Sequence, residues 1–320
     1  MIRHFILGID IGGTNTTFAL IDRKGVIHFK ENIPTHQYAD AKLLVRRIQE
    51  LINPSLQNNN QLIGIGIGAP NGNFYNGTIE FAPNLQWSGI IPLAQYFREL
   101  FGVPAFLTND ANAAALGEML FGNAKGMRDF IMVTLGTGLG SGIVINGKMV
   151  YGHDGFAGEL GHVIVEEDGR QCGCGRKGCL ETYSSVTGLK NTVVELLENP
   201  DIKSELRGFK FEDLSGKIIE QAAVSGDEIA QKAFGITAEY LGKALANIIA
   251  ITSPEAIILF GGLAQSDELI FKPTEYFMNK SILKIFENKV KLIPSALPTN
   301  EVALLGAAAL AWKELEELKA

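Results

Sequence analysis

The amino-acid sequence predicts an α/β protein made of two similar lobes with a cleft between them. The chain has 320 residues, of which 46% are hydrophobic and 20% charged, a globular balance with enough length for two cores. Two stretches share one layout, FILGIDIGGTNTTFALIDRKGVI from Phe5 and FIMVTLGTGLGSGIVINGKMVY from Phe130. Each reads as a strand, a glycine–threonine turn, a second strand, a polar turn and a third strand. No low-complexity linker separates the halves, so we expect the lobes to pack together.

The first third of the chain alternates strand and helix patterns. Apolar runs predict strands at residues 5–9, 16–21, 26–29, 62–67 and 103–107. The second and third of these form a hairpin over the polar turn DRKG. Helical spacing of apolar residues predicts helices at 41–52 and 111–120. We therefore assign residues 1–121 to a smaller N-terminal α/β lobe.

A second α/β unit opens at Phe130. Apolar spacing predicts one long helix at residues 229–251, followed by a buried strand at 256–260. The last segment, 302–318, is rich in Ala, Leu and Glu and predicts a helix. We expect residues 122–301 to form the larger lobe and residues 302–320 to pack back on the smaller one.

Charge and cysteine content argue against several classes of protein. The formal net charge of −7 disfavours a broad nucleic-acid surface, because phosphate binding needs a basic face. The apolar run before Asp10 is too short for the core of a signal peptide or for a membrane span. Three cysteines cannot all pair within one chain. We expect a soluble cytoplasmic protein with reduced thiols, no membrane association and no nucleic-acid partner.

Two glycine turns follow buried strands at matching places in the repeat. Backbone N–H groups of glycines can approach phosphate oxygens, a threonine hydroxyl adds a donor, and an aspartate at a strand end can hold Mg²⁺ through water. The alternative is a pair of ordinary β-turns. Because the turns occur as a matched pair, the sequence favours a phosphate site. Its residues are Asp10, Gly12, Gly13 and Thr14 in the first turn and Gly136, Thr137 and Gly138 in the second.

A third glycine pair, Gly261-Gly262, ends a buried strand and begins a predicted helix. This place suits close approach of a nucleotide's base or ribose, and packing at a strand–helix turn is the alternative. Two further stretches only approximate nucleotide motifs. GIVINGKM ends in Met149, which lacks the hydroxyl of a P-loop, and GIGIG has the wrong spacing for a dinucleotide fingerprint and precedes Pro70.

Asp110 lies in LTNDANAAALGEML, between a strand and an Ala-rich helix. A carboxylate at that strand end could take the proton of a substrate hydroxyl as its oxygen attacks phosphorus, while Asn109 holds the substrate's hydroxyls. The structural alternative is a helix N-cap, since aspartate accepts backbone hydrogen bonds there. The two roles conflict in part, because tight capping lowers the pKa of the carboxyl and weakens the base.

All three cysteines lie in one turn-rich stretch, GHVIVEEDGRQCGCGRKGCLETY. Cys172, Cys174 and Cys179, with His162 ten positions upstream of the first, supply three thiolates and one imidazole. Four such ligands complete a tetrahedral Zn²⁺ site with no open position, which is the arrangement of a structural metal. Free surface thiols are the alternative, and confinement of every cysteine to one loop disfavours it.

Two glutamates flank this cluster. Glu159 precedes His162 by three residues, and Glu181 follows the last cysteine by two. If the metal takes one ring nitrogen of His162, the other N–H is oriented and must donate. The three groups would then offer fixed donors and acceptors to a polyol. The sequence therefore predicts a metal-stiffened loop that contacts a sugar, and solvent-facing glutamates are the alternative.

Taken together, these motifs resemble the ROK family of repressors, open reading frames and kinases. They are DIGGTN, TNDANAAALGE, LGTGLGSGIVINGK, GELGH and CGCGRKGCLETY, and the likeness extends to SPEAIILFGGLA. It covers nearly the whole chain. The resemblance implies an actin-like/hexokinase-like two-lobed ATPase fold with a central cleft, and ATP- and Mg²⁺-dependent phosphorylation of a hexose or N-acylhexosamine.

The resemblance also implies roles for individual residues. The two glycine turns match the family's phosphate loops, Gly261 and Gly262 match its adenosine loop, and Asp110 matches its catalytic base. His162 and the three cysteines match its zinc ligands. The predicted substrate-binding residues are Gly68, Asn84, Asn109, Asp110, Glu159, His162 and Glu181.

The predicted activity is transfer of the γ-phosphoryl group of ATP to the 6-hydroxyl of a sugar, with glucose favoured. N-acetylmannosamine, N-acetylglucosamine and fructose are alternatives, because the loop GAPNGNFYNG looks individual and its Asn71 and Asn73 leave the choice open. Sugar-sensing repressors of the family carry a helix-turn-helix before the kinase-like part, whereas Asp10 already lies in the first phosphate loop, so we expect an enzyme. A non-catalytic sugar-binding regulator is the remaining alternative. The family resemblance favours a homodimer.

Overall fold

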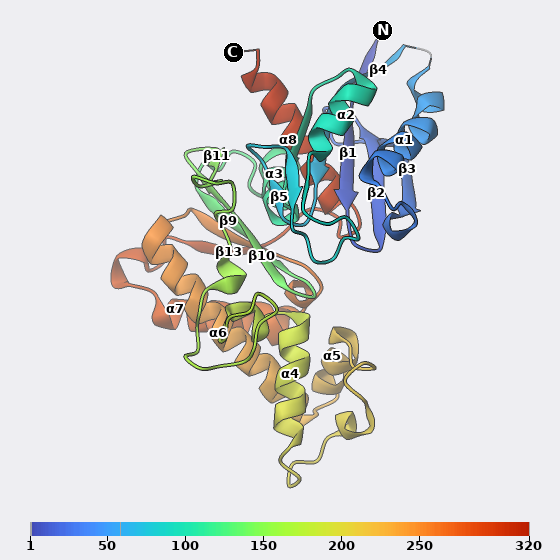
Figure 1. Cartoon of the computed structure of the whole chain (residues 1–320). Helices are drawn as coiled ribbons and strands as arrows, with labels where there is room; N and C mark the ends of the chain where they lie inside the picture. Colours follow the sequence, from blue (N-terminus) through green and yellow to red (C-terminus); the bar gives the residue numbers. More distant parts are fainter. Residues whose placement is uncertain (1, 58, 320) are drawn as a thin grey trace.

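The computed structural model describes residues 2–57 and 59–319, which form two lobes stacked one above the other (Figure 1). The smaller lobe is built on a five-stranded sheet in the order β3-β2-β1-β4-β8. The β1–β2 and β2–β3 pairs are antiparallel, and the β1–β4 and β4–β8 pairs are parallel. The strands are β1 (Arg3–Ile11), β2 (Asn15–Ile21), β3 (Ile27–Pro34), β4 (Asn60–Gly68) and β8 (Ala105–Thr108).

The larger lobe contains a second five-stranded sheet, in the order β11-β10-β9-β12-β13. Its pairs have the same directions as their counterparts in the first sheet: antiparallel for β9–β10 and β10–β11, parallel for β9–β12 and β12–β13. The internal repeat predicted from the sequence is therefore confirmed. The strands are β9 (Phe130–Leu135), β10 (Leu139–Ile145), β11 (Lys148–Met149), β12 (Ala256–Phe260) and β13 (Lys291–Pro294).

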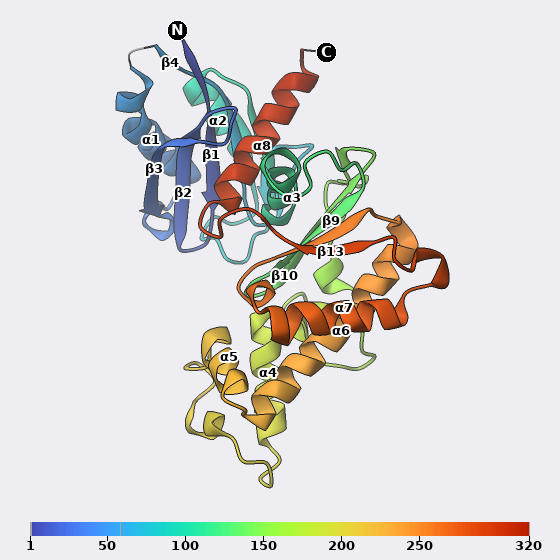
Figure 2. The same cartoon turned by 180° about the vertical axis from the view of Figure 1, so that it is seen from behind.

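Helices cover both faces of the first sheet. Two helices bury their apolar stripes against one face, where Leu44, Ile48 and Phe97 join a core with β1. The other face packs on the long buried helices in the centre of the molecule (Figure 2). The first pair is α1 (Ala41–Ile52) and α2 (Leu93–Phe101), and the second pair is α3 (Asp110–Phe121) and α8 (Val302–Glu317).

Glycines allow α8 to approach this sheet and α3 closely. A Cβ atom on Gly66 of β4 would lie 1.7 Å from the carbonyl oxygen of Ala307, and one on Gly306 would lie 2.2 Å from that of Ala113. The GIGIG stretch therefore serves helix packing. We propose residues 1–121 with 302–320 as one lobe and residues 122–301 as the other.

The larger lobe covers its sheet with four helices that share one core. The longest, α6, is long and apolar enough by length and composition to cross a membrane. Its apolar side chains instead face α4, α5 and α7, so it is the central helix of this lobe. The helices are α4 (Val186–Leu197), α5 (Gly216–Val224), α6 (Glu228–Thr252) and α7 (Lys272–Ser281).

The helix predicted directly after Gly262 begins as a 3₁₀ turn, Leu263–Gln265. After Ser266 the chain continues as a π-helical turn, Asp267–Phe271, which runs directly into α7 at Lys272. The intervening Ser266 has φ −86° and ψ 91°, an extended conformation that ends the helical turn.

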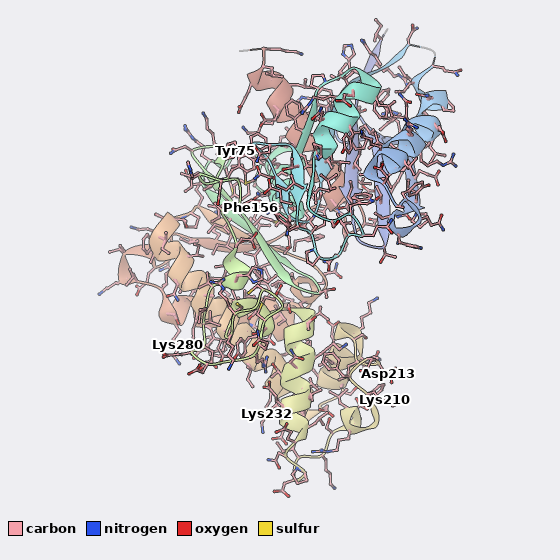
Figure 3. All side chains as sticks on the ribbon, in the orientation of Figure 1. Tyr75, Phe156, Lys210, Asp213, Lys232 and Lys280 are labelled. Atoms are coloured by element: carbon pink, nitrogen blue, oxygen red, sulfur yellow. The ribbon has the colours of Figure 1, made fainter. Side chains whose placement is uncertain are left out.

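A small three-stranded sheet extends the smaller lobe toward the larger one. It consists of β5 (Gly72–Asn73), β6 (Thr78–Glu80) and β7 (Ile90–Ile91). The hydroxyl of Tyr75 donates to the carbonyl oxygen of Gly152 at 2.8 Å, and Figure 3 shows Tyr75 and Phe156 near the junction of the two lobes. This contact links the two lobes.

Candidate active site

A cavity of about 440 Å³ lies between the two lobes. It is found at the carboxyl ends of parallel strands in both sheets, which is where open α/β sheets bind ligands. Its walls come from Pro70, Asn71, Asn84, Asn109, Asp110 and Ala111 of the smaller lobe and from residues 134–141, Gly158, Glu159, Glu181, Phe260 and Gly261 of the larger lobe. The cavity therefore joins residues that are far apart in the sequence.

Asp110 stands at the start of α3, facing the cavity. The N-cap of this helix is Asn109, whose Oδ1 accepts from the backbone N–H of Asn112 at 2.7 Å. The interpretation of Asp110 as the N-cap is therefore wrong, because it is the first helical residue and its Oδ1 accepts from the adjacent Ala111 N–H at 2.8 Å. Among the described residues, only the Ala111 N–H and its own backbone N–H bond to this carboxylate, which leaves acceptor capacity for a substrate hydroxyl.

Two carboxyl groups of the smaller lobe lie near each other. Asp10 at the end of β1 pairs in register with Gly68 of β4, which pairs with Thr108 of β8, two residues before Asp110. Burial, together with the negative charge of Asp110, raises the pKa of Asp10 to about 6. Burial also raises the pKa of Asp110. Because the negative charge of Asp110 disfavours ionisation of Asp10, the pair suits a cation or a proton-donating ligand.

The first glycine turn packs tightly against the loop that holds Asn84. The backbone N–H of Gly12 donates to Asn15 O at 2.9 Å and closes the turn between β1 and β2. A Cβ on Gly13 would lie 2.3 Å from Asn84 O, so only glycine fits there. Thr14 is exposed. Asn84 thus lines the cavity directly beside this turn, whereas Asp10 and residues 12–14 are not among the lining residues.

The second glycine turn lines the cavity and holds Glu181. The N–H of Gly136 donates to Gly138 O at 3.0 Å, and the N–H of Leu139 donates to Glu181 Oε2 at 3.1 Å. A Cβ on Gly138 would lie 2.3 Å from that same oxygen. By contrast, a Cβ on Gly136 would meet nothing within 4 Å. The turn therefore leaves open space beside Gly136 and Thr137 and fixes a carboxylate on its other side.

The glycine pair after β12 has two different roles. Gly261 has φ +113°, and its Cβ would lie 2.3 Å from Leu135 O, so it brings the ends of β12 and β9 together. Gly262 is exposed, with nothing around its Cβ position. A second cavity of about 380 Å³ shares Phe260 and Gly261 with the first, and Gln265 and Thr299 also line it.

His162 and the three cysteines meet in one cluster. Their ligand atoms all lie within 4.8 Å of one another. The Sγ atoms of Cys174 and Cys179 are 3.7 Å apart, and Cys172 Sγ is 3.7 Å from His162 Nδ1. Tetrahedral zinc with ordinary bond lengths separates neighbouring sulfur ligands by about 3.8 Å. The donor set and its spacing therefore fit zinc.

The cluster lies against the two predicted sugar-contacting glutamates. His162 Nε2, the nitrogen turned away from the sulfurs, is 3.9 Å from Glu159 Oε2, and Cys172 Sγ lies 3.6 Å from Glu181 Oε1. Burial raises the pKa of Glu159, against an opposing effect of His162, and the carboxylates of Asp110 and Glu181 raise it further. Three carboxyl groups thus converge on the cavity from both lobes.

The structure does not bring every predicted residue to the cavity wall. Gly68 is buried behind Asp110, with its Cβ position 4.0 Å from the Asp110 Cα, and His162 stands behind Glu159. Sequence reasoning missed Ser141 of β10, whose hydroxyl donates to Gly158 O and accepts from the Leu160 N–H.

Asn71 also lines the cavity, although the sequence marked it only as a departure from the expected loop. It has φ +50°, and its side-chain amide donates to Glu80 O at 3.0 Å, which keeps its backbone bent toward the cavity. Its place directly after Pro70 at the end of β4 was the signal that could have identified it.

Comparisons with known proteins agree with this architecture. A family profile described as the ROK family matches residues 6–314. A glucokinase from Halalkalibacterium halodurans is 36% identical over 85% of this chain and 84% of its own. A xylose repressor from Caldicellulosiruptor bescii is 32% identical over 93% of this chain and 76% of its own.

A solved structure extends the likeness to three dimensions. The ROK family glucokinase from Streptomyces griseus, in complex with glucose and AMPPNP, has a TM-score of 0.79 and 32% identity, and the match covers 97% of this chain and 99% of that one. The predicted actin-like/hexokinase-like fold is confirmed. The glucokinase relatives support a sugar kinase. The match over residues 6–314, together with these relatives, shows that the chain belongs to the ROK family.

Proposed function

We propose that this protein is an ATP-dependent hexose kinase that phosphorylates the 6-hydroxyl of glucose. The observation that carries the proposal is one cavity into which Asp110, a glycine turn and two glutamates beside a metal-type cluster all project. A carboxylate, phosphate-binding backbone groups and a polyol-binding wall are the parts that phosphoryl transfer to a sugar requires.

The nucleotide lies along the larger lobe. The open space beside Gly136 and Thr137 receives the terminal phosphates. The second cavity, which shares Gly261 with the first, receives the nucleoside. Gly262 gives this part of the nucleotide close access to the backbone.

The sugar lies between Asn109, Asn84, Glu159 and Glu181, which line the same cavity. The Oδ1 of Asn109 is committed to capping α3, so its amide group is left to donate to a sugar hydroxyl. Carboxylates accept hydrogen bonds, so the two glutamates receive hydroxyl donors from the other side. This division of donors and acceptors suits a hexose.

Asp110 acts as the general base. Its carboxylate takes the proton of the sugar 6-hydroxyl while the hydroxyl oxygen forms a bond to the γ-phosphorus. The bond between the γ-phosphorus and the bridging oxygen breaks, and ADP leaves with the electron pair. The raised pKa of Asp110 makes it a better proton acceptor once it is ionised.

Two metals fit the residues of the site. Asp10, at the end of β1 and close to Asp110, would hold Mg²⁺ through water, and Mg²⁺ supplies positive charge against the phosphates. His162, Cys172, Cys174 and Cys179 would hold a structural Zn²⁺ that keeps Glu159 and Glu181 in place. His162 then donates its other N–H toward Glu159 and supports the sugar indirectly.

Glucose is the favoured acceptor because glucokinases are among the relatives and because the cavity wall offers both donors and acceptors. N-acetylmannosamine, N-acetylglucosamine and fructose are the acceptors against which it must be compared. We further propose that the protein is cytoplasmic and forms a homodimer. Light scattering on the purified protein tests the dimer.

The test is a coupled assay of zinc-loaded protein with ATP, Mg²⁺ and each of the four sugars. We expect glucose to give the highest kcat/KM, with glucose 6-phosphate and ADP formed in equal amounts. Turnover of another sugar in preference would correct the acceptor. If calorimetry shows that glucose binds but no ADP forms, the protein is a non-catalytic regulator and not an enzyme. The repressor relatives represent that class.

A further inference from the structure

Two chain segments cross between the lobes, and both meet at one carboxylate. Residues 122–129 connect α3 to β9, and residues 295–301 connect β13 to α8. Glu118, in the last turns of α3, accepts from the backbone N–H of Asn123 at 2.7 Å and from the hydroxyl of Ser295. Asn123 in turn donates from its side chain to Pro294 O at 2.9 Å. The outgoing and returning segments are thus tied together at Glu118.

The surroundings of Glu118 show that this position is built for a carboxylate. Its side chain is fully buried, with 0% exposure, and it forms no ion pair among the described residues. Gly122 is the first residue of the segment that leaves α3, and a Cβ atom there would lie 2.1 Å from Glu118 Oε2. Glycine at this position therefore leaves room for the acid. Burying an acid without a cation costs stability, and the two hydrogen bonds that Glu118 accepts offset that cost. An apolar side chain would leave both donors without this acceptor and would not join the two segments.

Glu118 lies on the same rigid helix as the proposed base. Asp110 begins α3, and eight residues at 1.5 Å each place the two about 12 Å apart along the helix axis. On the other side, the backbone N–H of Ser295 donates to Leu259 O at 2.9 Å, directly before Phe260 and Gly261 of the nucleotide cavity. A path of two hydrogen bonds thus connects the helix carrying the base to the loop beside the nucleotide.

We propose that Glu118 is a positioning residue that, through Ser295, fixes the helix carrying Asp110 relative to the nucleotide loop when the lobes close. The inference rests on the proposed kinase function. In-line transfer requires the sugar oxygen and the γ-phosphorus to meet within a narrow distance, and these two groups are held by different lobes. A loose hinge would leave each ligand bound but their mutual distance variable.

The experiment compares Ser295→Ala with Ser184→Ala. Each change removes one serine hydroxyl, because Ser184 Oγ donates to Thr237 O at 3.1 Å within the core of the larger lobe, away from both crossings. We expect Ser295→Ala to lower kcat about tenfold while KM for glucose and ATP stays within about threefold. Ser184→Ala should lower the unfolding temperature by a similar amount and leave kcat unchanged. Equal kcat in the two variants would overturn the inference.

Variants of Glu118 itself separate positioning from direct contact. Ser295 also lines the second cavity, which we assign to the nucleoside, so its hydroxyl can also act by contacting the nucleotide directly. If Ser295 acts through Glu118, adding Ser295→Ala to Glu118→Ala causes no further loss of kcat. Glu118→Gln should recover much of the activity lost in Glu118→Ala, because a glutamine can accept from Asn123 and donate to Ser295. Additive losses in the double variant would refute the coupling.

A measurement that needs only ligand binding separates this inference from the proposed function. Small-angle scattering should show that glucose with a non-hydrolysable ATP analogue compacts the wild-type protein and compacts Ser295→Ala less. Identical compaction in both proteins would overturn the hinge role even if wild-type turnover is high. If the wild type phosphorylates no sugar while the compaction still differs, the proposed acceptor chemistry fails and the hinge role stands.

Discussion

The two sheets of this protein share one strand order but carry different chemical groups at their carboxyl ends. In the smaller lobe, β1 and β8 lead to Asp10 and Asp110. In the larger lobe, β9 ends at Leu135, and the turn that follows offers backbone N–H groups and a seat for Glu181. Duplication of the sheet supplies the frame of the cleft. The residues that follow the strands give it different groups, two carboxyls in the smaller lobe and a glycine turn that holds a glutamate in the larger one.

The connections after the third strand of each repeat differ as well. In the smaller lobe the chain forms helix α1 before returning as β4. In the larger lobe it first runs through residues 150–185, where only short 3₁₀ turns and isolated bridges occur among the described elements, and where the four metal-type ligands lie. A segment with so little regular hydrogen bonding needs another source of rigidity. Zinc would supply it, as the core of α1 does in the other lobe.

Replacing the proposed base, Asp110, should have the largest effect. Asp110→Asn keeps the size of the side chain and the oxygen that accepts from Ala111, but it removes the proton acceptor. We expect kcat to fall by at least about 10²-fold, while glucose affinity measured by calorimetry changes little. Asp227→Asn is the matched control, because Asp227 is the N-cap of α6 and accepts from Ala230 at 3.0 Å far from the cavity. Near-normal turnover of Asp110→Asn would exclude Asp110 as the base.

Asp10 is a largely buried acid at the end of β1, and the end of β9 carries no such acid. We therefore expect the stability cost of a buried carboxylate at this position only in the smaller lobe. Because the folded pKa of Asp10 is raised to about 6 from 3.8, the stability this group contributes is complete below pH 4 and is lost as pH rises through 6. The loss amounts to up to about 3 kcal/mol.

Asp10→Asn should therefore match the metal-free wild type at pH 4 and exceed its free energy of unfolding at pH 7. Urea denaturation at pH 4, 5, 6 and 7 measures this difference. Asp213→Asn is the control, because this exposed acid lies on the side of the larger lobe, beside α5 (Figures 1 and 3). Parallel curves for wild type and Asp10→Asn would contradict the raised pKa.

Removing the proposed zinc tests whether a metal gives the loop of the larger lobe the rigidity that a hydrophobic core gives the smaller lobe. Cys174→Ser, or dialysis against a strong chelator, should raise the glucose KM at least about tenfold, because Glu159 and Glu181 lose their support. Limited proteolysis should then cut within residues 163–179 and leave the smaller lobe intact. Re-addition of Zn²⁺ but not Mg²⁺ should restore the chelated protein. Unchanged KM and unchanged proteolysis would show that the cluster holds no structural metal.

The sequence was sufficient for most elements but not for contacts made across the fold. Helix 41–52 and strand 256–260 were predicted with the observed bounds, because their apolar spacing is regular and uninterrupted. The identity of the α3 cap could not be read, since Asn109 and Asp110 are both good cap residues. The hydrogen bond of Glu118 to Ser295 joins residues 177 positions apart, and no local pattern marks it. Such contacts depend on how the two lobes meet.

The smallest expected effects come from substitutions of two glycines in the second repeat, one of which should change only stability and the other only the KM for ATP. Gly136 faces open space without a positive φ, whereas Gly147, in the β10–β11 turn, has φ +73°. Gly147→Ala should therefore cost about 1 kcal/mol of stability through backbone strain and leave kinetics unchanged. Gly136→Ala should leave the unfolding temperature unchanged, but its methyl group would occupy space proposed for phosphate, so KM for ATP should rise several-fold. Thermal unfolding of both variants measures the expected difference in stability, and steady-state kinetics measures the expected difference in KM for ATP. If Gly136→Ala lowers stability and spares the KM for ATP, the turn is a structural feature of the sheet and the phosphates bind elsewhere.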